Sequence, residues 1–242
     1  MELTLVQFLT GLFSLILAVI SIYVGLYIAS RYRKVNNKIL LYFGIGWIGF
    51  MNGFWPSAIN FILVITTGTA MSLVPYSIIG LAFLPWWLIV WMIGITELLY
   101  KEKQKPIMIF TLIFAIIYDS VLFFYVFTGD HSKIGALQGP VDVKYTGLVA
   151  LMLLSLLIIV VVTGILLAIN SLKSDTKETK LRGIFILYTF LSWIIAAIYD
   201  GMFDLNVITL IIVRIVLITC SISAYIGFLM PKFVKRIFGI KE

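Results

Sequence analysis

Residues 147–170 read GLVALMLLSLLIIVVVTGILLAIN and contain no charged side chain. A helix rises 1.5 Å per residue, so a run of about 20 apolar residues crosses the ~30 Å hydrocarbon layer of a bilayer. Six further runs of this kind occupy residues 5–28, 39–62, 73–99, 106–127, 184–203 and 207–230. The sequence therefore predicts an all-α integral membrane protein, a seven-transmembrane-helix bundle that forms one domain over residues 1–242.

Composition supports the lipid environment. Of the 242 residues, 62% are hydrophobic and 12% are charged, whereas soluble domains are about half apolar and a quarter charged. Four segments, 31–38, 101–105, 172–182 and the tail after residue 230, hold 15 of the 18 basic residues. Basic loops remain cytoplasmic, so we expect the N-terminus outside and the C-terminus in the cytoplasm. This pattern explains the net charge of +7 without a nucleic-acid partner.

The flanking segments are short. The first run lacks a basic leader and continues into Arg31, so we expect it to remain as a membrane helix and not to be a cleaved signal peptide. The tail, residues 231–242, places Phe233 and Ile237 four residues apart among basic residues, which is typical of a short amphipathic helix on anionic inner-leaflet lipids. The loop 128–146 is expected to be a plain connection, with a cap over the outer mouth as the alternative. We expect a multi-pass protein of the plasma membrane.

Three ionisable residues lie within predicted spans at similar depths. Asp119, Asp200 and Arg214 belong to the fourth, sixth and seventh helices, in the outer half of the bilayer. Charges in lipid are costly and mark functional sites by default. An unpaired charge costs more than a paired one. We therefore expect the three side chains to meet in one buried charge cluster.

Aromatic residues lie near these charges. Each aspartate is the last residue of a string Ala-x-Ile-Tyr-Asp. Tryptophans occur within the second and third helices, and Pro85 predicts a kink in the third. These side chains could pack together or could wall an apolar pocket for a small ligand. The possible pocket-lining residues are Tyr118, Tyr199, Trp55, Trp86, Trp87 and Trp91.

Several chemistries lack their required residues. The last helix has no lysine for a retinal Schiff base, and Arg214 keeps its proton. The one histidine, His131, lies in a loop, so we expect no metal site. We expect no cofactor and no enzymatic activity. An intramembrane aspartyl protease stays as an alternative because two Tyr-Asp pairs exist, although the partner motif Gly-x-Gly-Asp is missing.

Residues 26–47, LYIASRYRKVNNKILLYFGIGW, form a short basic connection followed by a helix that contains a tryptophan. This stretch resembles the start of the seven-transmembrane sensor modules found ahead of histidine kinases. The resemblance implies that an extracytoplasmic ligand or membrane state is transmitted to a cytoplasmic output. The chain has no kinase of its own, so the output would need a separate cytoplasmic protein partner.

We therefore expect a receptor-like membrane sensor that functions in signal transduction. A ligand or proton would change the pairing of Asp119, Asp200 and Arg214, and a cytoplasmic partner would read the resulting helix shifts. A small ion- or proton-coupled transporter or channel using the same charges is the first alternative. A structural subunit of a membrane complex and the aspartyl protease are the others.

Overall fold

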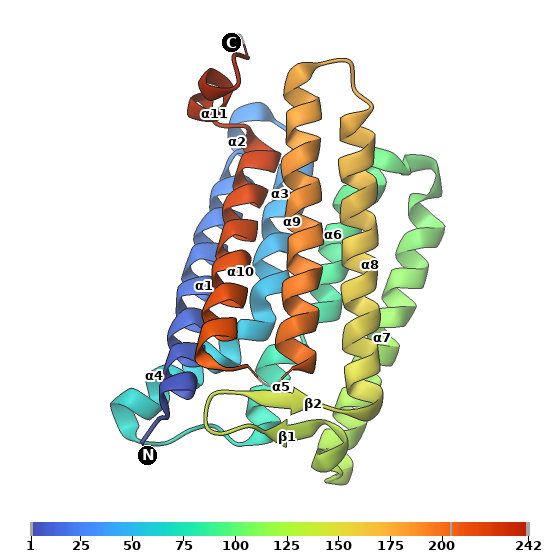
Figure 1. The fold of residues 1–242 in the computed structure, drawn as a ribbon. Coiled ribbons are helices and arrows are strands. Elements are labelled where there is room, and N and C mark those ends of the chain that lie inside the picture. The colour runs from blue at the N-terminus through green and yellow to red at the C-terminus, as the bar shows by residue number, and fades with distance from the viewer. Residues whose placement is uncertain (1, 204, 241–242) are drawn as a thin grey trace.

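The computed structural model describes residues 2–203 and 205–240, with only the main chain of Met202. Within these residues, seven long apolar helical spans lie side by side in one bundle, which confirms the predicted fold class (Figure 1). The spans are Leu5–Val35, Lys38–Thr67, Leu73–Leu99, Lys101–Thr128, Gly147–Leu172, Lys177–Gly201 and Val207–Leu229. Each overlaps one predicted run. The largest differences are at the sixth span, which begins seven residues earlier than predicted because its first two turns are polar, and at the first, which ends seven residues later because α2 extends it.

The elements follow one another with short connections. In chain order they are α1 (Leu5–Ser30), α2 (Tyr32–Val35), α3 (Lys38–Phe50), η1 (Met51–Phe54), α4 (Trp55–Thr67), α5 (Leu73–Leu81), α6 (Leu84–Leu99), η2 (Lys101–Lys103), α7 (Gln104–Thr128), η3 (His131–Lys133), β1 (Gly135–Leu137), β2 (Val143–Tyr145), α8 (Gly147–Leu172), α9 (Lys177–Met202), α10 (Val207–Leu229) and α11 (Lys232–Ile237). The predicted tail helix is α11; residues 241 and 242 of the tail lie outside the described part of the chain.

Two spans are interrupted near a proline. Pro56 stands at the start of α4 and Pro85 at the start of α6, so the chain changes helix type or direction just before each ring. Proline lacks the N–H that a continuous helix needs and clashes with the preceding turn. The kink predicted at Pro85 is confirmed, since α5 ends at Leu81 and α6 begins at Leu84.

The helices pack in an order that differs from their order in the chain. α9 lies between α8 and α10, α10 also packs against α1, and α1 packs against α3 and α4. On the other side α6 packs against α3 and α7. Close approach of α1 and α3 requires Gly25 and Gly44, because a Cβ on Gly44 would lie 2.5 Å from the backbone nitrogen of Ala29. Small residues at such contacts are how membrane helices associate.

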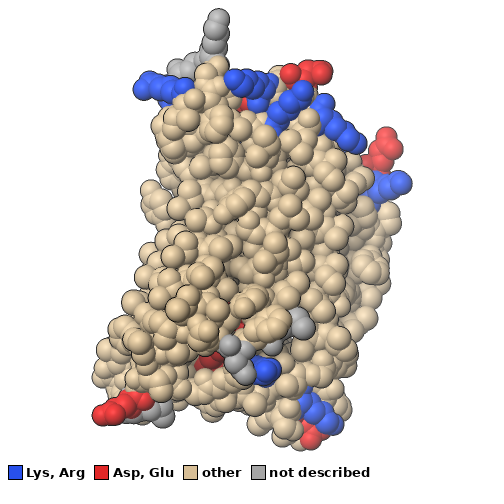
Figure 2. Space-filling view, in the orientation of Figure 1, with Lys and Arg blue, Asp and Glu red and all other residues tan. Residues whose placement is uncertain are grey.

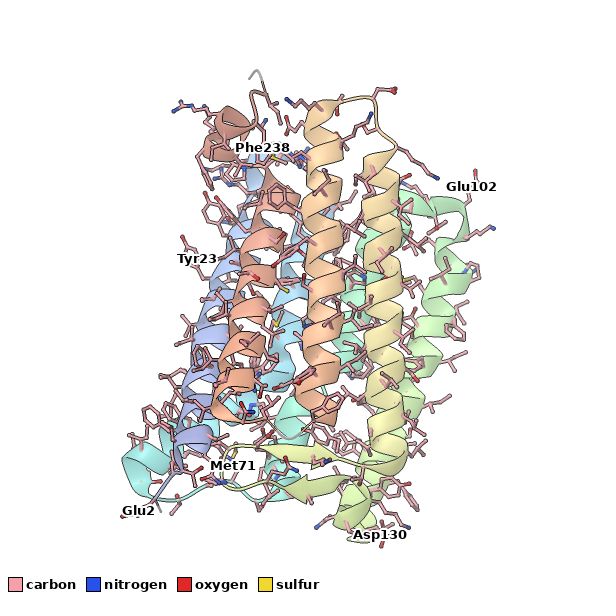
Figure 3. The ribbon with its side chains drawn as sticks, viewed as in Figure 1. Glu2, Tyr23, Met71, Glu102, Asp130 and Phe238 are labelled. Carbon is pink, nitrogen blue, oxygen red and sulfur yellow. The ribbon has the colours of Figure 1, made fainter. Side chains whose placement is uncertain are left out.

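The two ends of the bundle differ in charge and shape. One end, which we call the hairpin end, holds the N-terminal residues and the β1–β2 hairpin. The opposite end, the basic end, holds α2, α11 and most of the lysine and arginine side chains (Figure 2). Glu2 and Asp130 lie at the hairpin end and Glu102 and Phe238 at the basic end (Figure 3). On the face that Figure 2 shows, the surface between the ends carries almost no charged side chain, as is expected of a surface toward lipid.

The connection between α7 and α8 is a folded cap, not the plain connection expected from sequence. β1 and β2 pair antiparallel with Gly135 opposite Tyr145, and the hairpin runs across the bundle end (Figure 1). Ile134 and Val141 are fully buried beneath it. The burial of these two aliphatic side chains stabilises the contact between the hairpin and the helices, because it removes apolar surface from water.

Candidate functional site

Two cavities meet at the hairpin end around one set of charged side chains. The first has a volume of about 430 Å³ and the second about 320 Å³. Asp142, Asp200 and Arg214 line both. The other residues of the first wall are mainly apolar and come from α3, η1, α4, α5, α6, β2, α8 and α9. The second is polar and includes Thr4, Gln7 and Thr10 from α1 and its cap.

Asp200 and Arg214 form a two-pronged ion pair. Asp200 lies in the last turn of α9, and Arg214 lies about two turns into α10. Arg214 Nη1 donates to Asp200 Oδ2 at 3.0 Å, and Nη2 lies 3.0 Å from Oδ1. The guanidinium also sits 5.1 Å from the centre of the Phe54 ring. The arginine side chain is 4% exposed and the aspartate 21%, so the pair is largely shielded from water and its attraction is strong.

The hairpin brings a second carboxylate to this pair. Asp142 precedes β2, and its Oδ1 accepts a 2.8 Å hydrogen bond from the Val143 N–H. Burial and repulsion from Asp200 raise the pKa of Asp142 to about 6, and Arg214 opposes the shift only weakly. The carboxylate is surrounded by protein yet lines both cavities, so protons and ligands can reach it. The folded structure therefore favours the protonated form of Asp142 more than water does.

Hydrogen bonds to α4 and α5 hold the hairpin turn in place. Asn60 Nδ2 donates to the Pro140 carbonyl at 2.8 Å, and Asn60 Oδ1 accepts from the Met71 N–H at 2.8 Å. Met71 lies beside the hairpin in Figure 3. The Tyr76 hydroxyl lies 2.6 Å from Ser57 Oγ and donates to the Val141 carbonyl at 3.3 Å. These buried contacts fix the position of Asp142.

Asp119 does not join this cluster, which corrects the expected triad. Its Oδ2 accepts a 2.7 Å hydrogen bond from Trp86 Nε1, and it lines neither of the two cavities. α7 packs mainly on α6, whereas Asp200 belongs to α9 between α8 and α10. Equal depth in the bilayer therefore does not bring the two aspartates together. They also do not form the carboxylate pair that the protease alternative requires.

The tryptophans expected in a pocket line neither cavity. Trp91 is fully buried, donates from Nε1 to Thr163 Oγ1 at 2.9 Å, and packs against a ring cluster of Phe43, Phe50, Phe190 and Phe228. Trp87 packs against Gly49. Trp86 is 44% exposed where it meets Asp119. Trp55 is only partly buried at the start of α4. Packing, which the sequence left open as an alternative, describes their observed positions.

The two tyrosines of the repeated string differ from each other. Tyr118 is 2% exposed, while Tyr199 is 40% exposed and stacks on Phe203 with ring centres 4.8 Å apart. Neither lines the two cavities. The two copies of the string therefore occupy different environments, and neither tyrosine contributes to the two cavities around Arg214.

Sequence reasoning missed Asp142 and Trp193. Trp193 is buried and lines the first cavity, but nothing in the helix pattern separates it from packing tryptophans. Asp142 had a detectable signal, because it stands in the alternating run Val141-Asp142-Val143, which directly follows Gly139-Pro140. A turn dipeptide followed by alternating apolar and polar residues indicates a hairpin strand.

Among the described residues, no group of three or more His, Cys, Asp or Glu side chains is arranged to hold a metal ion. Searches with protein-family models, among curated proteins and among solved structures find no match to this chain. The function has therefore to be inferred from the cavities and the charges around them.

Proposed function

We propose that the protein is a receptor-like membrane sensor whose ligand occupies the 430 Å³ cavity at the hairpin end. The observation that carries this proposal is the Asp200–Arg214 ion pair exposed to that cavity. Ligand pockets of 300–1,000 Å³ with mostly apolar walls and a few convergent polar groups are typical binding sites. A charged or polar ligand group placed here would compete directly for one member of the pair.

The ion pair joins the two helices that a signal would have to move. A buried pair is strongly destabilised when one partner is neutralised or drawn away, since the remaining charge is left in a poor solvent. A ligand that binds Asp200 or Arg214 therefore changes the free energy that holds the end of α9 against α10. Switches of this kind are local electrostatic events with effects at a distance.

The same two helices meet the tail at the basic end. Glu178, in the first turn of α9, accepts from Arg182 and from Lys235 of α11, both at 2.7 Å. Arg182 also donates to the Phe228 carbonyl of α10 at 3.0 Å, and Lys177 donates to the Phe238 carbonyl at 2.7 Å. A shift of α9 along or around α10 would thus disturb these contacts and the position of α11.

We assign the basic end to the cytoplasm, because it holds most of the lysine and arginine residues and basic loops remain on the cytoplasmic side. Phe233 and Ile237 of α11 are 55% and 73% exposed, which suits contact with anionic lipids of the inner leaflet. A cytoplasmic protein partner would read the movement of α11 and the neighbouring loops. The plasma membrane is the location that this arrangement suits.

Packing beneath the cavity favours sensing over transport. The fully buried rings of Trp91 and Phe190 fill the bundle core, with Phe50 stacked on Trp193 at a ring distance of 5.9 Å. Transport requires a path that alternately opens to each side. Within the described residues, the cavity with the charged cluster lies toward the hairpin end, and an aromatic core separates it from the basic end.

Distance measurements between spin labels test the proposed coupling. Labels at positions 175 and 237, in a Cys220→Ser background, would report the α8–α9 loop and α11. We expect Asp200→Asn to shift or broaden their distance distribution, with a mean change of about 1–2 Å, the size of typical helix shifts. Asp119→Asn is the matched control, because it neutralises a membrane aspartate bonded only to Trp86. An unchanged distribution in Asp200→Asn and in Arg214→Gln would refute the coupling.

A further inference from the structure

Building on the proposed function, we infer that the ligand is a single-chain amphiphile with an ammonium head group. The head lies against Asp142 and Asp200, and the chain lies along the apolar wall of the 430 Å³ cavity. Three features carry this inference: the balance of charge, the chemistry of the wall and the place where the wall reaches the surface.

Charge in the site favours a cation. Two carboxylates and one guanidinium line the cavity, so the site is negative when both acids are ionised. Both terminal nitrogens of Arg214 pair with Asp200. Among the described residues, no lysine or arginine lies within ion-pair distance of Asp142. Burial and repulsion from Asp200 raise the pKa of Asp142, and the more distant Arg214 lowers it only slightly, so a cation placed beside Asp142 would be favoured.

Aromatic rings next to the carboxylates suit an ammonium group. Tyr76, Tyr145 and Trp193 line the same cavity as Asp142. Aromatic faces attract quaternary and primary ammonium groups, and this attraction grows when water is excluded. An anionic ligand would meet Arg214 through its unpartnered Nε–H, but it would also face two acidic side chains. The arrangement therefore selects against a carboxylate or phosphate head.

The apolar wall continues to the outside of the bundle between α8 and α9. Leu151 and Leu154 of α8 and Ile198 of α9 line the cavity and are 61%, 42% and 36% exposed. The charged groups lie toward the hairpin end and the leucines extend toward the bundle centre. A lipid-like molecule in the adjacent leaflet has its polar head toward the hairpin end and its chain toward the bilayer centre, as the cavity requires. Such a molecule can therefore enter from the membrane between α8 and α9 without reversing its orientation.

Head-group chemistry, not chain burial, must provide selectivity for such a ligand. Moving a chain from lipid into an apolar cavity changes its surroundings little, because lipid tails are as apolar as leucine. Charge-assisted hydrogen bonds to buried carboxylates are stronger than neutral ones. We therefore expect an alkylammonium ion to bind at least about tenfold more tightly than the alcohol with the same chain.

Binding of radiolabelled dodecylamine to the full chain in phosphatidylcholine nanodiscs tests this inference, with dodecanol and dodecanoate as competitors. We expect saturable binding that the alcohol and the carboxylate displace at least tenfold less well. Asp142→Asn should weaken dodecylamine binding about tenfold or more, while Asp119→Asn should leave it unchanged.

A cavity-filling variant separates the cavity from the protein surface. Gly53 lines the cavity, and a Cβ built there meets no atom within 4 Å, so Gly53→Leu should fill the cavity without a clash. Ala197→Leu, at the α9 wall, provides a second blocking variant if the first does not fold. We expect both to abolish saturable binding of dodecylamine.

Contrary outcomes have distinct meanings. Preferential binding of dodecanoate would overturn the ammonium head group but would leave the proposed ligand cavity intact. Dodecylamine binding that persists in both filled variants would overturn the inference, because the molecule would then bind elsewhere. Saturable binding of none of the three probes would also overturn it, and the proposed coupling would still be judged by the spin-label distances.

Discussion

Replacing Asp142 by asparagine should stabilise the protein at pH 8. The folded structure raises the pKa of this carboxyl from 3.8 to about 6. Between about pH 4 and pH 6 the folded chain therefore binds more protons than the unfolded chain, so stability falls as the pH rises through this window. Asparagine cannot ionise, so the Asp142→Asn variant does not incur this loss.

The pKa shift sets an upper bound on the gain. One pKa unit corresponds to about 1.4 kcal/mol, so the shift from 3.8 to about 6 allows at most about 3 kcal/mol. The carboxylate is reachable from both cavities, and solvent there screens part of the repulsion. We expect Asp142→Asn to raise the free energy of unfolding by about 1–2 kcal/mol at pH 8 and by nothing measurable at pH 4.

The sign of the effect should reverse when Asp200 is absent. In an Asp200→Asn background, Asp142 is the carboxylate that still lines the two cavities with Arg214, at more than ion-pair distance. Removing it leaves a buried guanidinium with neither of these two acidic neighbours, which costs about 2 kcal/mol or more. Asp142→Asn should therefore stabilise the wild-type chain and destabilise the Asp200→Asn chain. This reversal is the specific signature of the three-residue cluster.

Reversible unfolding in mixed detergent micelles at pH 4, 6 and 8 measures both effects. Asp130→Asn is a suitable control, because Asp130 pairs with Lys133 at the exposed edge of the hairpin end. The reasoning is refuted if Asp142→Asn destabilises the wild-type chain at pH 8, or if its effect has the same sign in both backgrounds.

Two further predictions concern the rest of the bundle. Gly44→Ala should lower the free energy of unfolding by about 1–3 kcal/mol in the same assay, because the new methyl would collide with the backbone at Ala29. The control Gly53→Ala, whose methyl meets open space, should change it by less than about 1 kcal/mol. Glu178→Gln removes the ion pair between residue 178 and Lys235 of α11, so the tail should be cleaved faster by a protease. The free energy of unfolding should change by no more than about 1 kcal/mol. An unchanged proteolysis rate would argue against the coupling of α9 to the tail.

The membrane class, the seven spans and the break near Pro85 could be predicted from the sequence alone. These features depend on local quantities: the length of an apolar run, the distribution of basic residues and the missing N–H of proline. It also identified Asp200 and Arg214, because a charge in a membrane span needs a partner wherever that span lies.

Which of the charged side chains meet depends on how the helices pack. Asp119 matches Asp200 in depth and in its local string, yet it faces Trp86 because α7 packs on α6 and not beside α9. Asp142 lies outside every span and reaches the site because the hairpin folds back over the bundle end. The depth of a residue in the bilayer can be estimated from its position in an apolar run. Which helices neighbour that run, and which of its sides faces them, follows from the packing of all seven spans.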